Sequence, residues 1–343
     1  MRKLGNVLYV TTPEAFLALD GENVVVKKDD AVSMRLPLHN LDSIVCMNYA
    51  GVSPALMGAC AERNMGLTFL RRSGRFLARV TGRVQGNVLL RKRQYAQAGD
   101  EAARVSVASS CVLGKIANSR RVIDRAVRDH SAVVDVAALR AVSAALKESL
   151  RAVRSCIHVE ALRGQEGYAG RMYFSVFGSL ILHQRDAFTF SERSRRPPRD
   201  NLNALLSFFY TLLTFEVASA LETVGLDPYV GFMHADRPGR PSLALDMMEE
   251  LRPVFADRLA LTLVNRKQVT GEGFTRKESG GVLMTDEMRK TVLTAWQERK
   301  REEIVHPYLK ERISFGLIPH VQATLMARYL RGDLDAYPPY IWS

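Results

Sequence analysis

The segment RVQGNVLLRKRQY, residues 83–95, lies where the hydrophobic pattern of the chain changes. Before it, apolar residues come in short alternating runs, which is the period of β-strands. From Asn87 onward, apolar residues recur at helical spacing, beginning with Leu89, Leu90 and Tyr95. We therefore predict an α+β fold, with an N-terminal antiparallel β domain over residues 1–86 and a larger, mostly α-helical domain over residues 87–343.

Turn residues divide the first domain into strands. A helix is predicted over residues 54–63, because Ser53 is a favoured N-cap and Pro54 a favoured first helical residue. Beyond that helix, Ser73-Gly74 should form the turn of a hairpin. The predicted strands cover residues 7–11, 16–19, 24–28, 33–36, 43–47, 66–71 and 76–80.

The charge of the chain favours a polyanionic partner. Its 343 residues carry 48 Lys and Arg against 36 Asp and Glu, a formal net charge of +12. No acidic residue occurs between Glu62 and Asp100, and such one-sign segments repel themselves unless an anion neutralises them. The basic residues of this segment are Arg63, Arg71, Arg72, Arg75, Arg79, Arg83, Arg91, Lys92 and Arg93.

The four cysteines are far apart and form neither a CxxC pair nor a zinc-binding spacing with histidine. We expect them to be reduced and mostly buried. The first ten residues have no long apolar run and no small-residue cleavage site, so we predict a cytoplasmic protein without signal peptide or membrane contact.

Glu166 lies in EALRGQEGYAGRMYF, residues 160–174, where three glycines interrupt a helical pattern. Each glycine costs a helix about 1 kcal/mol relative to alanine. Two interpretations remain open: the glycines permit tight helix packing and Glu166 is solvated, or small neighbours leave room for a phosphate beside a metal-bound Glu166. Carboxylate oxygens suit Mg²⁺ and Mn²⁺.

His234 lies in a predicted loop, GFMHADRPGRPS, residues 231–242, followed by Arg237 and Arg240. An isolated histidine is usually structural or exposed. Loops on a rigid scaffold, however, are where binding residues concentrate, and the two arginines suit phosphate.

A third acidic group lies in SLALDMMEELRP, residues 242–253, predicted as a helix with Ser242 as N-cap and Pro253 as terminator. Asp246 and Glu249 are three residues apart and should share a face, with Glu250 beside them. Such like charges repel unless a cation bridges them, although a solvated acidic face is the alternative. With Glu166 and His234, this helix would complete an oxygen and imidazole ligand set for Mg²⁺ or Mn²⁺.

Other catalytic schemes lack their motifs. The chain has no GxSxG, HExxH or GxxxxGK[ST] sequence, and no GxGxxG after a strand. Serine hydrolase, zinc protease, P-loop and Rossmann functions are therefore disfavoured.

These segments, together with FTFSERSRRPPRDNLNALLSF at residues 188–208, resemble the Cas-one family, the CRISPR spacer-acquisition integrases. The motifs occur in the family's order and the similarity runs nearly end to end. The resemblance implies an N-terminal β domain for dimerisation and DNA backbone contact, a helical metal-dependent catalytic domain, a homodimer, and a complex with the Cas-two protein. The ending Tyr337-Pro338-Pro339-Tyr340 is similar to the subtype I-C branch, which suggests a Cas-four partner.

Transferred to this sequence, the family's metal ligands and catalytic residues are Glu166, His234 and an acid of the third motif. The family's acidic pair falls on Asp246 and Glu249, and we favour Glu249 as the direct ligand with Asp246 supporting or bridging. Arg71, Arg72 and Arg75 of the hairpin, with Arg237 and Arg240, are expected to bind phosphates of double-stranded DNA. For the basic stretch 193–199 two interpretations remain open: a solvated loop, or a loop that faces DNA or organises the dimer. Asp200 and Asn203 should cap and hold the following helix.

The implied reaction is a transesterification in which the 3′-hydroxyl of a captured DNA fragment attacks a phosphodiester at the edge of the repeat array. Such an exchange needs no nucleotide cofactor, only alignment and charge stabilisation. Two alternatives remain: a free-standing metal nuclease that cleaves branched DNA in repair, and a non-enzymatic nucleic-acid scaffold.

Overall fold

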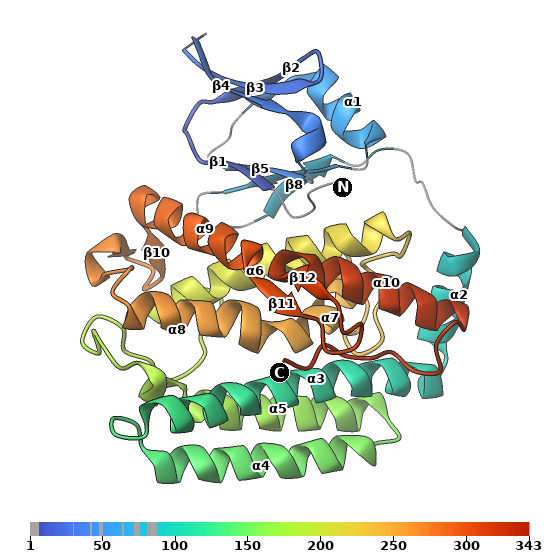
Figure 1. Ribbon diagram of the computed structural model, residues 1–343, viewed down its shortest axis with the longest axis vertical. Coiled ribbons are helices and arrows are strands. Elements are labelled where there is room, and N and C mark those ends of the chain that lie inside the picture. Colours follow the sequence, from blue (N-terminus) through green and yellow to red (C-terminus); the bar gives the residue numbers. More distant parts are fainter. Residues whose placement is uncertain are drawn as a thin grey trace. The chain divides into compact units, whose positions relative to one another are not determined.

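The computed structural model describes residues 7–29, 31–41, 43–47, 51–63, 65–71, 76–80, 82 and 88–342 (Figure 1). The chain forms two compact units. The first comprises residues 1–85, 284–304 and 313–317, and the second comprises residues 86–283, 305–312 and 318–343. A strand-rich N-terminal part followed by a mostly helical remainder confirms the predicted α+β fold.

Two four-stranded sheets make up most of the first unit. One has the strand order β4-β3-β2-β6, and its β2–β3 and β3–β4 pairs are antiparallel, as predicted. The other has the order β1-β5-β7-β8. The strands are β1 (Val7–Val10), β2 (Phe16–Asp20), β3 (Asn23–Lys28), β4 (Ala31–Pro37), β5 (Ser43–Met47), β6 (Gly51–Val52), β7 (Gly66–Leu70) and β8 (Phe76–Val80).

The second sheet corrects the expectation of an antiparallel domain, because β1, β5 and β7 run parallel to one another. The connection from β5 to β7 contains helix α1 (Pro54–Glu62). Such a helical crossover brings the chain back to the edge of the sheet where β5 begins, so β7 runs in the same direction as β5. Ser53 caps α1 as predicted, since its side chain accepts a hydrogen bond from the backbone N–H of Leu56. The β7–β8 pair is the expected antiparallel hairpin, although its predicted Ser73-Gly74 turn lies outside the described residues.

The second unit is built around one long helix, α3. Figure 1 shows α3, α4 and α5 side by side, and α3 also packs against α7, which in turn packs against α6. α3 therefore connects the elements that carry the predicted site. The helices are α2 (Val88–Gly99), α3 (Glu101–His130), α4 (Val136–Arg154), α5 (Val159–Ser175), α6 (Asn201–Thr223), α7 (Ser242–Arg252), α8 (Arg258–Asn265) and α10 (Ile318–Arg331).

Aspartate side chains define where three of these helices begin. Asp100, Asp135 and Asp200 each accept a hydrogen bond from the backbone N–H three residues later, which satisfies one of the free donors of a helix start. The predicted cap at Asp200 is thereby confirmed. Asn203 holds the preceding loop, because its amide donates to the Glu192 carbonyl and accepts from the Ser194 N–H.

The start and end of α7 differ from the prediction. Ser242 is the first helical residue rather than the N-cap, and its hydroxyl donates to the Ala235 carbonyl. Pro253 does not end the helical path, which continues through a π-helical turn (Pro253–Asp257) into α8. Proline lacks the backbone N–H that a regular helix uses, and the wider turn accommodates it. In this turn the N–H of Arg258 donates to the carbonyl of Pro253.

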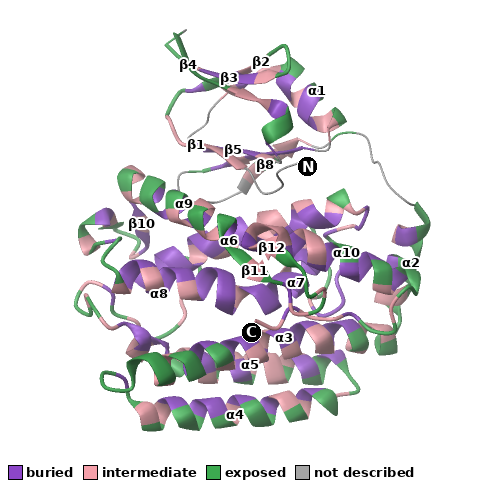
Figure 2. Cartoon of the chain, viewed as in Figure 1, coloured by how far each residue is buried: buried purple, intermediate pink, exposed green. Residues whose placement is uncertain are grey.

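α6 is the most apolar helix of the second unit. By length and composition it would suffice to cross a membrane, yet 61% of its most apolar window is buried inside the protein. Figure 2 shows that most residues of α6 and α7 are buried or half-buried, whereas α4 has exposed residues along one face. α6 therefore has the burial of a core helix.

The remaining elements are short or come late in the chain. β9 (Phe274–Arg276) and β10 (Val282–Met284) pair in a small two-stranded sheet, and β11 (Glu303–Val305) pairs with β12 (Arg312–Ser314). Helix α9 (Asp286–Arg301) belongs to the first unit, an association that the pattern of residues 1–86 does not reveal. Cys46, Cys60, Cys111 and Cys156 are free thiols, and all but Cys156 are buried, as predicted.

Candidate metal centre

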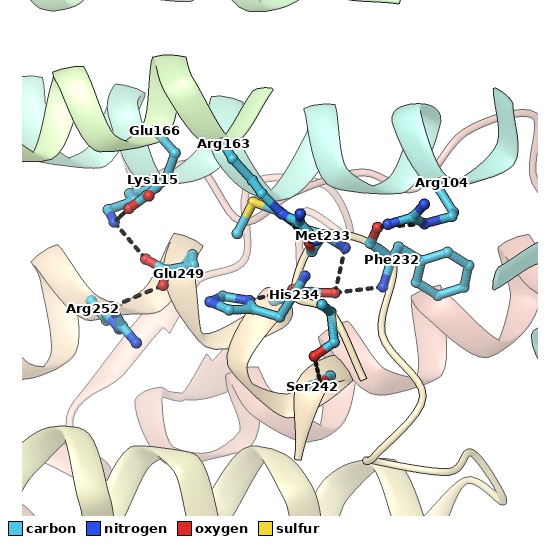
Figure 3. Close-up of polar contacts among 12 residues, drawn as sticks. Arg104, Lys115, Arg163, Glu166, Phe232, Met233, His234, Ser242, Glu249 and Arg252 are labelled. Carbon is cyan, nitrogen blue, oxygen red and sulfur yellow. Dashed lines mark hydrogen bonds and ion pairs between the residues drawn. The ribbon is translucent and has the colours of Figure 1, made fainter. Parts of the chain in front are cut away.

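Two of the predicted acids converge on one cation inside the second unit. Glu166 of α5 and Glu249 of α7 both contact Lys115 of α3 (Figure 3). The Lys115 ammonium donates a hydrogen bond to Oε1 of Glu166, and its Nζ lies 2.7 Å from Oε2 of Glu249. Carboxylates 83 positions apart in the chain therefore point at one place.

Glu249 is held as a buried anion. Its side chain is 2% exposed, and its Oε1 lies 2.8 Å from Nη1 of Arg252, one helical turn later. Burial acts to raise the pKa of Glu249, but the charges of Arg252 and Lys115 outweigh it and lower the pKa to about 2. The buried Oε2 of Glu249 has the Lys115 ammonium as its partner, and this contact also lowers the pKa of Glu249.

Lys115 remains charged in this site. Its side chain is 11% exposed, and burial alone would lower its pKa. The charges of Glu249 and Glu166 reverse that effect and raise the pKa of Lys115 above its ordinary value. An ammonium therefore neutralises part of the carboxylate pair.

Asp246 shapes the loop that carries His234. Its Oδ2 accepts backbone N–H bonds from Phe232 at 2.7 Å and Met233 at 2.9 Å, and its Oδ1 accepts the N–H of His234 at 2.9 Å. From the other side, Arg104 donates to the Phe232 carbonyl and Arg163 to the Met233 carbonyl. The loop is thus fixed through both kinds of backbone polar group (Figure 3).

The same aspartate orients the imidazole. Nδ1 of His234 lies 2.6 Å from Oδ1 of Asp246, which leaves Nε2 for a different partner. The ring extends from its loop toward Glu249 in Figure 3, and His234 is among the groups that lower the pKa of Glu249. A carboxylate on one ring nitrogen is the usual arrangement of a metal-binding histidine.

The described residues include no group of three or more His, Cys, Asp or Glu side chains close enough to hold a metal ion. Glu166 and Glu249 meet through Lys115, while His234 is paired with Asp246. The residues nevertheless fit a divalent ion. The carboxylates of Glu166 and Glu249 converge on one cation, and an oriented imidazole lies nearby.

Repulsion within the acidic helix is relieved by separate partners. Asp246 faces the loop, Glu249 faces Lys115 and Arg252, and Glu250 faces the C-terminal segment. Glu250 accepts hydrogen bonds from the Tyr337 hydroxyl and the Tyr340 N–H. Burial raises its pKa to about 7. Glu250 therefore has different partners from the other two acids and holds the C-terminal segment.

A cavity of about 440 Å³ is lined by Glu166 and by Lys115, the cation that both carboxylates contact. The glycines near Glu166 are open rather than tightly packed: a Cβ on Gly164 would meet no atom within 4 Å, and Gly167 and Gly170 line the cavity. Close helix packing therefore does not explain them. The lining includes the basic side chains of Lys115, Arg171, Arg193, Arg195 and Arg252.

A half-buried tyrosine and a buried aspartate form another wall of this cavity. The Tyr210 hydroxyl donates to Oδ1 of Asp257 at 2.6 Å, and the guanidinium groups of Arg193 and Arg252 lie 5.1 and 4.9 Å from the Tyr210 ring centre. Burial raises the pKa of Asp257 to about 6. Arg193 is half-buried and bonds Asn203 and Ser207, so the basic stretch 193–199 is not simply a solvated loop.

The arginines after His234 lie in a positive neighbourhood. Burial lowers the pKa of Arg240, and the nearby charges of Arg237, Arg163 and Arg196 add to this effect. Such clustering favours an anionic ligand. Of the predicted hairpin arginines, Arg71 is exposed, whereas Arg72 and Arg75 lie outside the described residues.

Lys115, Arg252, Tyr210 and Asp257 were not predicted from the sequence. One signal did exist for Lys115: it lies on the apolar stripe of α3, four residues after Cys111 and one before Ile116. A charge on a buried stripe requires a partner. For Tyr210 and Asp257 the helical pattern gives no such signal, because the π-helical turn that carries Asp257 is not visible in the sequence.

Comparison with known proteins adds independent evidence. The family model described as CRISPR associated protein Cas1, the Cas-one family, matches residues 8–298. A protein from Rhodospirillum rubrum named CRISPR-associated endonuclease Cas1 2 is 53% identical over 346 residues, covering 100% of both chains. A Geobacter sulfurreducens protein, named a CRISPR-associated exonuclease Cas4/endonuclease Cas1 fusion, is 35% identical over 98% of this chain and 60% of its own length.

Solved structures share the fold. A Cas1 protein from Thermotoga maritima superimposes with a TM-score of 0.82 at 21% identity, covering 97% of this chain and 99% of that one. A chain of a Cas6-RT-Cas1–Cas2 complex gives a TM-score of 0.82 at 22% identity, over 99% of this chain and 36% of that one. The family model and the full-length relative together establish that this chain belongs to the Cas1 family.

Proposed function

We propose that this chain inserts captured DNA fragments into a CRISPR repeat array by metal-dependent transesterification. The proposal is carried by the convergence of Glu166 and Glu249 on one cation beside an arginine-lined cavity. It is supported by 53% identity over the full length to a protein named a CRISPR-associated endonuclease.

In the proposed reaction, the 3′-hydroxyl oxygen of the fragment forms a new bond to a repeat phosphorus as the original 3′-oxygen of the repeat strand leaves. Glu166, His234 and Glu249 would hold Mg²⁺ or Mn²⁺, which supplies Lewis-acid stabilisation of the phosphate. Asp246 keeps the His234 ring in place through Nδ1, and Arg237 and Arg240 bind DNA phosphates. Arg71, Arg72 and Arg75 are proposed to bind the DNA backbone without reading its sequence.

The proposed assembly is a homodimer that joins double-stranded DNA and a Cas2 protein, with residues 1–86 contributing dimerisation and residues 87–343 catalysis. One structural neighbour is a chain of a complex named for Cas1 and Cas2, and one relative is named as a Cas4 fusion. These names support Cas2 and Cas4 as partners here. We further propose subtype I-C, from the ending Tyr337-Pro338-Pro339-Tyr340, and a cytoplasmic location where the repeat array is accessible.

A strand-transfer assay tests the function. A labelled duplex with a free 3′-hydroxyl is incubated with a repeat-bearing plasmid, Mn²⁺, the protein and its Cas2 partner. Wild type should yield joined product, and Glu166→Ala or His234→Ala should lower the yield about a hundredfold or more. Glu148→Ala on α4, which removes an exposed carboxylate, is the matched control and should join DNA normally.

The assay also separates the alternatives. A duplex ending in a 3′-dideoxynucleotide lacks the attacking oxygen and should not be joined. If the protein cleaves branched DNA but joins none, it is a repair nuclease and not an integrase. If it binds DNA but neither cleaves nor joins it, it is a nucleic-acid scaffold.

A further inference from the structure

Lys115 is placed where a divalent ion would have to bind. It comes from α3, whereas the two carboxylates that it contacts come from α5 and α7. Its Nζ lies 2.7 Å from the buried Oε2 of Glu249, so the ammonium occupies the side of that carboxylate which Arg252 leaves open. An ammonium and a divalent ion repel each other, so they compete for these carboxylates.

Lys115 is held by two carboxylates but also has space to move away from them. Two buried or half-buried carboxylates facing each other are costly unless a cation neutralises them, and Lys115 supplies that charge. Lysine carries its charge on a flexible four-carbon stem, unlike the rigid fork of arginine. Lys115 itself lines the cavity of about 440 Å³ beside Glu166, so its ammonium has free space within reach.

We propose that Lys115 is a positioning residue that competes with the divalent ion for Glu166 and Glu249 and moves into the adjoining cavity to bind a DNA phosphate when the ion enters. The proposal rests on the proposed function, because it takes the metal ligands and the DNA substrate from it. Before DNA arrives, the lysine keeps the carboxylates together and weakens metal binding. DNA relieves the competition by giving the ammonium a second anion.

This exchange requires a thermodynamic coupling between DNA and metal. If a phosphate draws Lys115 away from the carboxylates, DNA must tighten metal binding, and metal must tighten DNA binding by the same factor. Removing the ammonium should abolish the coupling and leave the metal site permanently accessible.

The test is a Mn²⁺ titration of the full chain, following free Mn²⁺ by electron paramagnetic resonance, with and without a 3′-hydroxyl duplex. Lys115→Met keeps the stem but removes the charge, and should bind Mn²⁺ about tenfold more tightly than wild type without DNA, a factor within the ordinary range of site coupling. DNA should tighten Mn²⁺ binding in wild type but not in this variant. Lys147→Met on exposed α4 is the matched control and should behave as wild type in both titrations.

A lysine that only supports the fold would give a different result. Lys115→Met would then bind Mn²⁺ no more tightly than wild type, and that outcome overturns the proposal. Lys115→Arg keeps the charge and should retain the weak Mn²⁺ binding of wild type, so tight binding by this variant also contradicts competition. Circular dichroism and thermal unfolding of each variant establish that folded protein is compared, and Mn²⁺ should raise the Tm of Lys115→Met more than that of wild type.

The Mn²⁺ titration and the strand-transfer assay test the two proposals independently. If wild type joins DNA but Lys115→Met shows unchanged Mn²⁺ affinity, the lysine proposal is wrong and the function stands. If the Mn²⁺ affinities shift as expected but no DNA is joined, Lys115 still competes with the ion and the integrase function is wrong.

Discussion

Asp246 illustrates how one buried carboxylate can organise a site without touching substrate. It accepts three consecutive backbone N–H groups and holds the His234 ring. Hydrogen bonds to a charged acceptor contribute about 1.5–3 kcal/mol each, more than neutral ones. The loop and the imidazole therefore depend on the same charge.

Asp246→Asn should lower the free energy of unfolding by about 3 kcal/mol, because an amide nitrogen would face backbone donors. It should also weaken Mn²⁺ binding about 10–100-fold, the usual effect of losing a partner that orients a ligand. Chemical denaturation and Mn²⁺ titration measure the two effects. Asp236→Asn, an exposed residue of the same loop, is the control, and equal stability of both variants would refute this role of Asp246.

Asp257 should make stability depend on pH. Its pKa is raised from 3.8 to about 6, so the folded protein keeps a proton that the unfolded chain releases as pH rises through 4. The unfolding free energy contributed by this group should fall by about 3 kcal/mol between pH 4 and pH 6 and then stay level.

Asp257→Asn removes the titration while keeping an oxygen for the Tyr210 hydroxyl. The difference in unfolding free energy between wild type and variant should therefore change with pH in that window, in favour of wild type at low pH. Urea denaturation at a series of pH values measures it. A difference that is independent of pH would show that Asp257 is not protonated in the folded protein.

At the scale of the elements, close approach of α3 to α7 depends on Gly114. A Cβ there would lie 2.7 Å from the Cβ of Glu250 and 3.1 Å from that of Pro339. Gly164 on α5 has no atom within 4 Å of the same position. The two helical glycines thus differ in packing but not in helix propensity.

Gly114→Ala should destabilise the protein by about 1–3 kcal/mol, because overpacking outweighs the better helix propensity of alanine. Gly164→Ala should instead stabilise it by up to about 1 kcal/mol. Thermal unfolding of both variants checks the pair. If Gly114→Ala were as stable as Gly164→Ala, the close packing of α3 against α7 at this glycine would be wrong.

The sequence predicted those helices and strands well whose position depends on neighbouring residues. The change of period near residues 83–95, the capped starts at Ser53 and Asp200 and the β2–β3–β4 meander are all fixed by neighbouring residues. The parallel pairing of β1, β5 and β7 was not predicted, since it depends on a crossover. Likewise, the π-helical turn at Pro253 is a compromise between a proline and continued packing.

At the scale of the whole molecule, the site required contacts that no sequence spacing encodes. Glu166, His234 and the acids of α7 were found as candidates from their types and motifs. The pairing of Glu166 and Glu249 with Lys115, and the bonds of Arg104 and Arg163 to the backbone of the His234 loop, depend on how α3 and α5 pack against α7 and that loop. The different hydrogen-bond partners of Asp246 and Glu250 likewise follow from tertiary packing rather than from helix periodicity.

The net charge of +12 predicts DNA binding that weakens steeply with salt. Replacing Arg237 and Arg240 together with alanine should lower the slope of log affinity against log salt by about 2, since each phosphate that is no longer neutralised removes roughly 0.9. Fluorescence anisotropy with a labelled duplex at several salt concentrations measures this slope. The control is Arg140→Ala with Arg154→Ala on α4, and an equal change in both double variants would rule out a specific phosphate-binding role.

The proposed chemistry depends above all on Glu166, His234 and Glu249 holding one divalent ion at the edge of the arginine-lined cavity. Anomalous diffraction at the manganese edge, from crystals grown with Mn²⁺ and a 3′-hydroxyl duplex, tests this most directly. We expect one strong peak about 2.0–2.3 Å from a carboxylate oxygen of each glutamate and from Nε2 of His234, with Lys115 turned toward DNA. A peak bound elsewhere, with Lys115 still between the two glutamates, would contradict it.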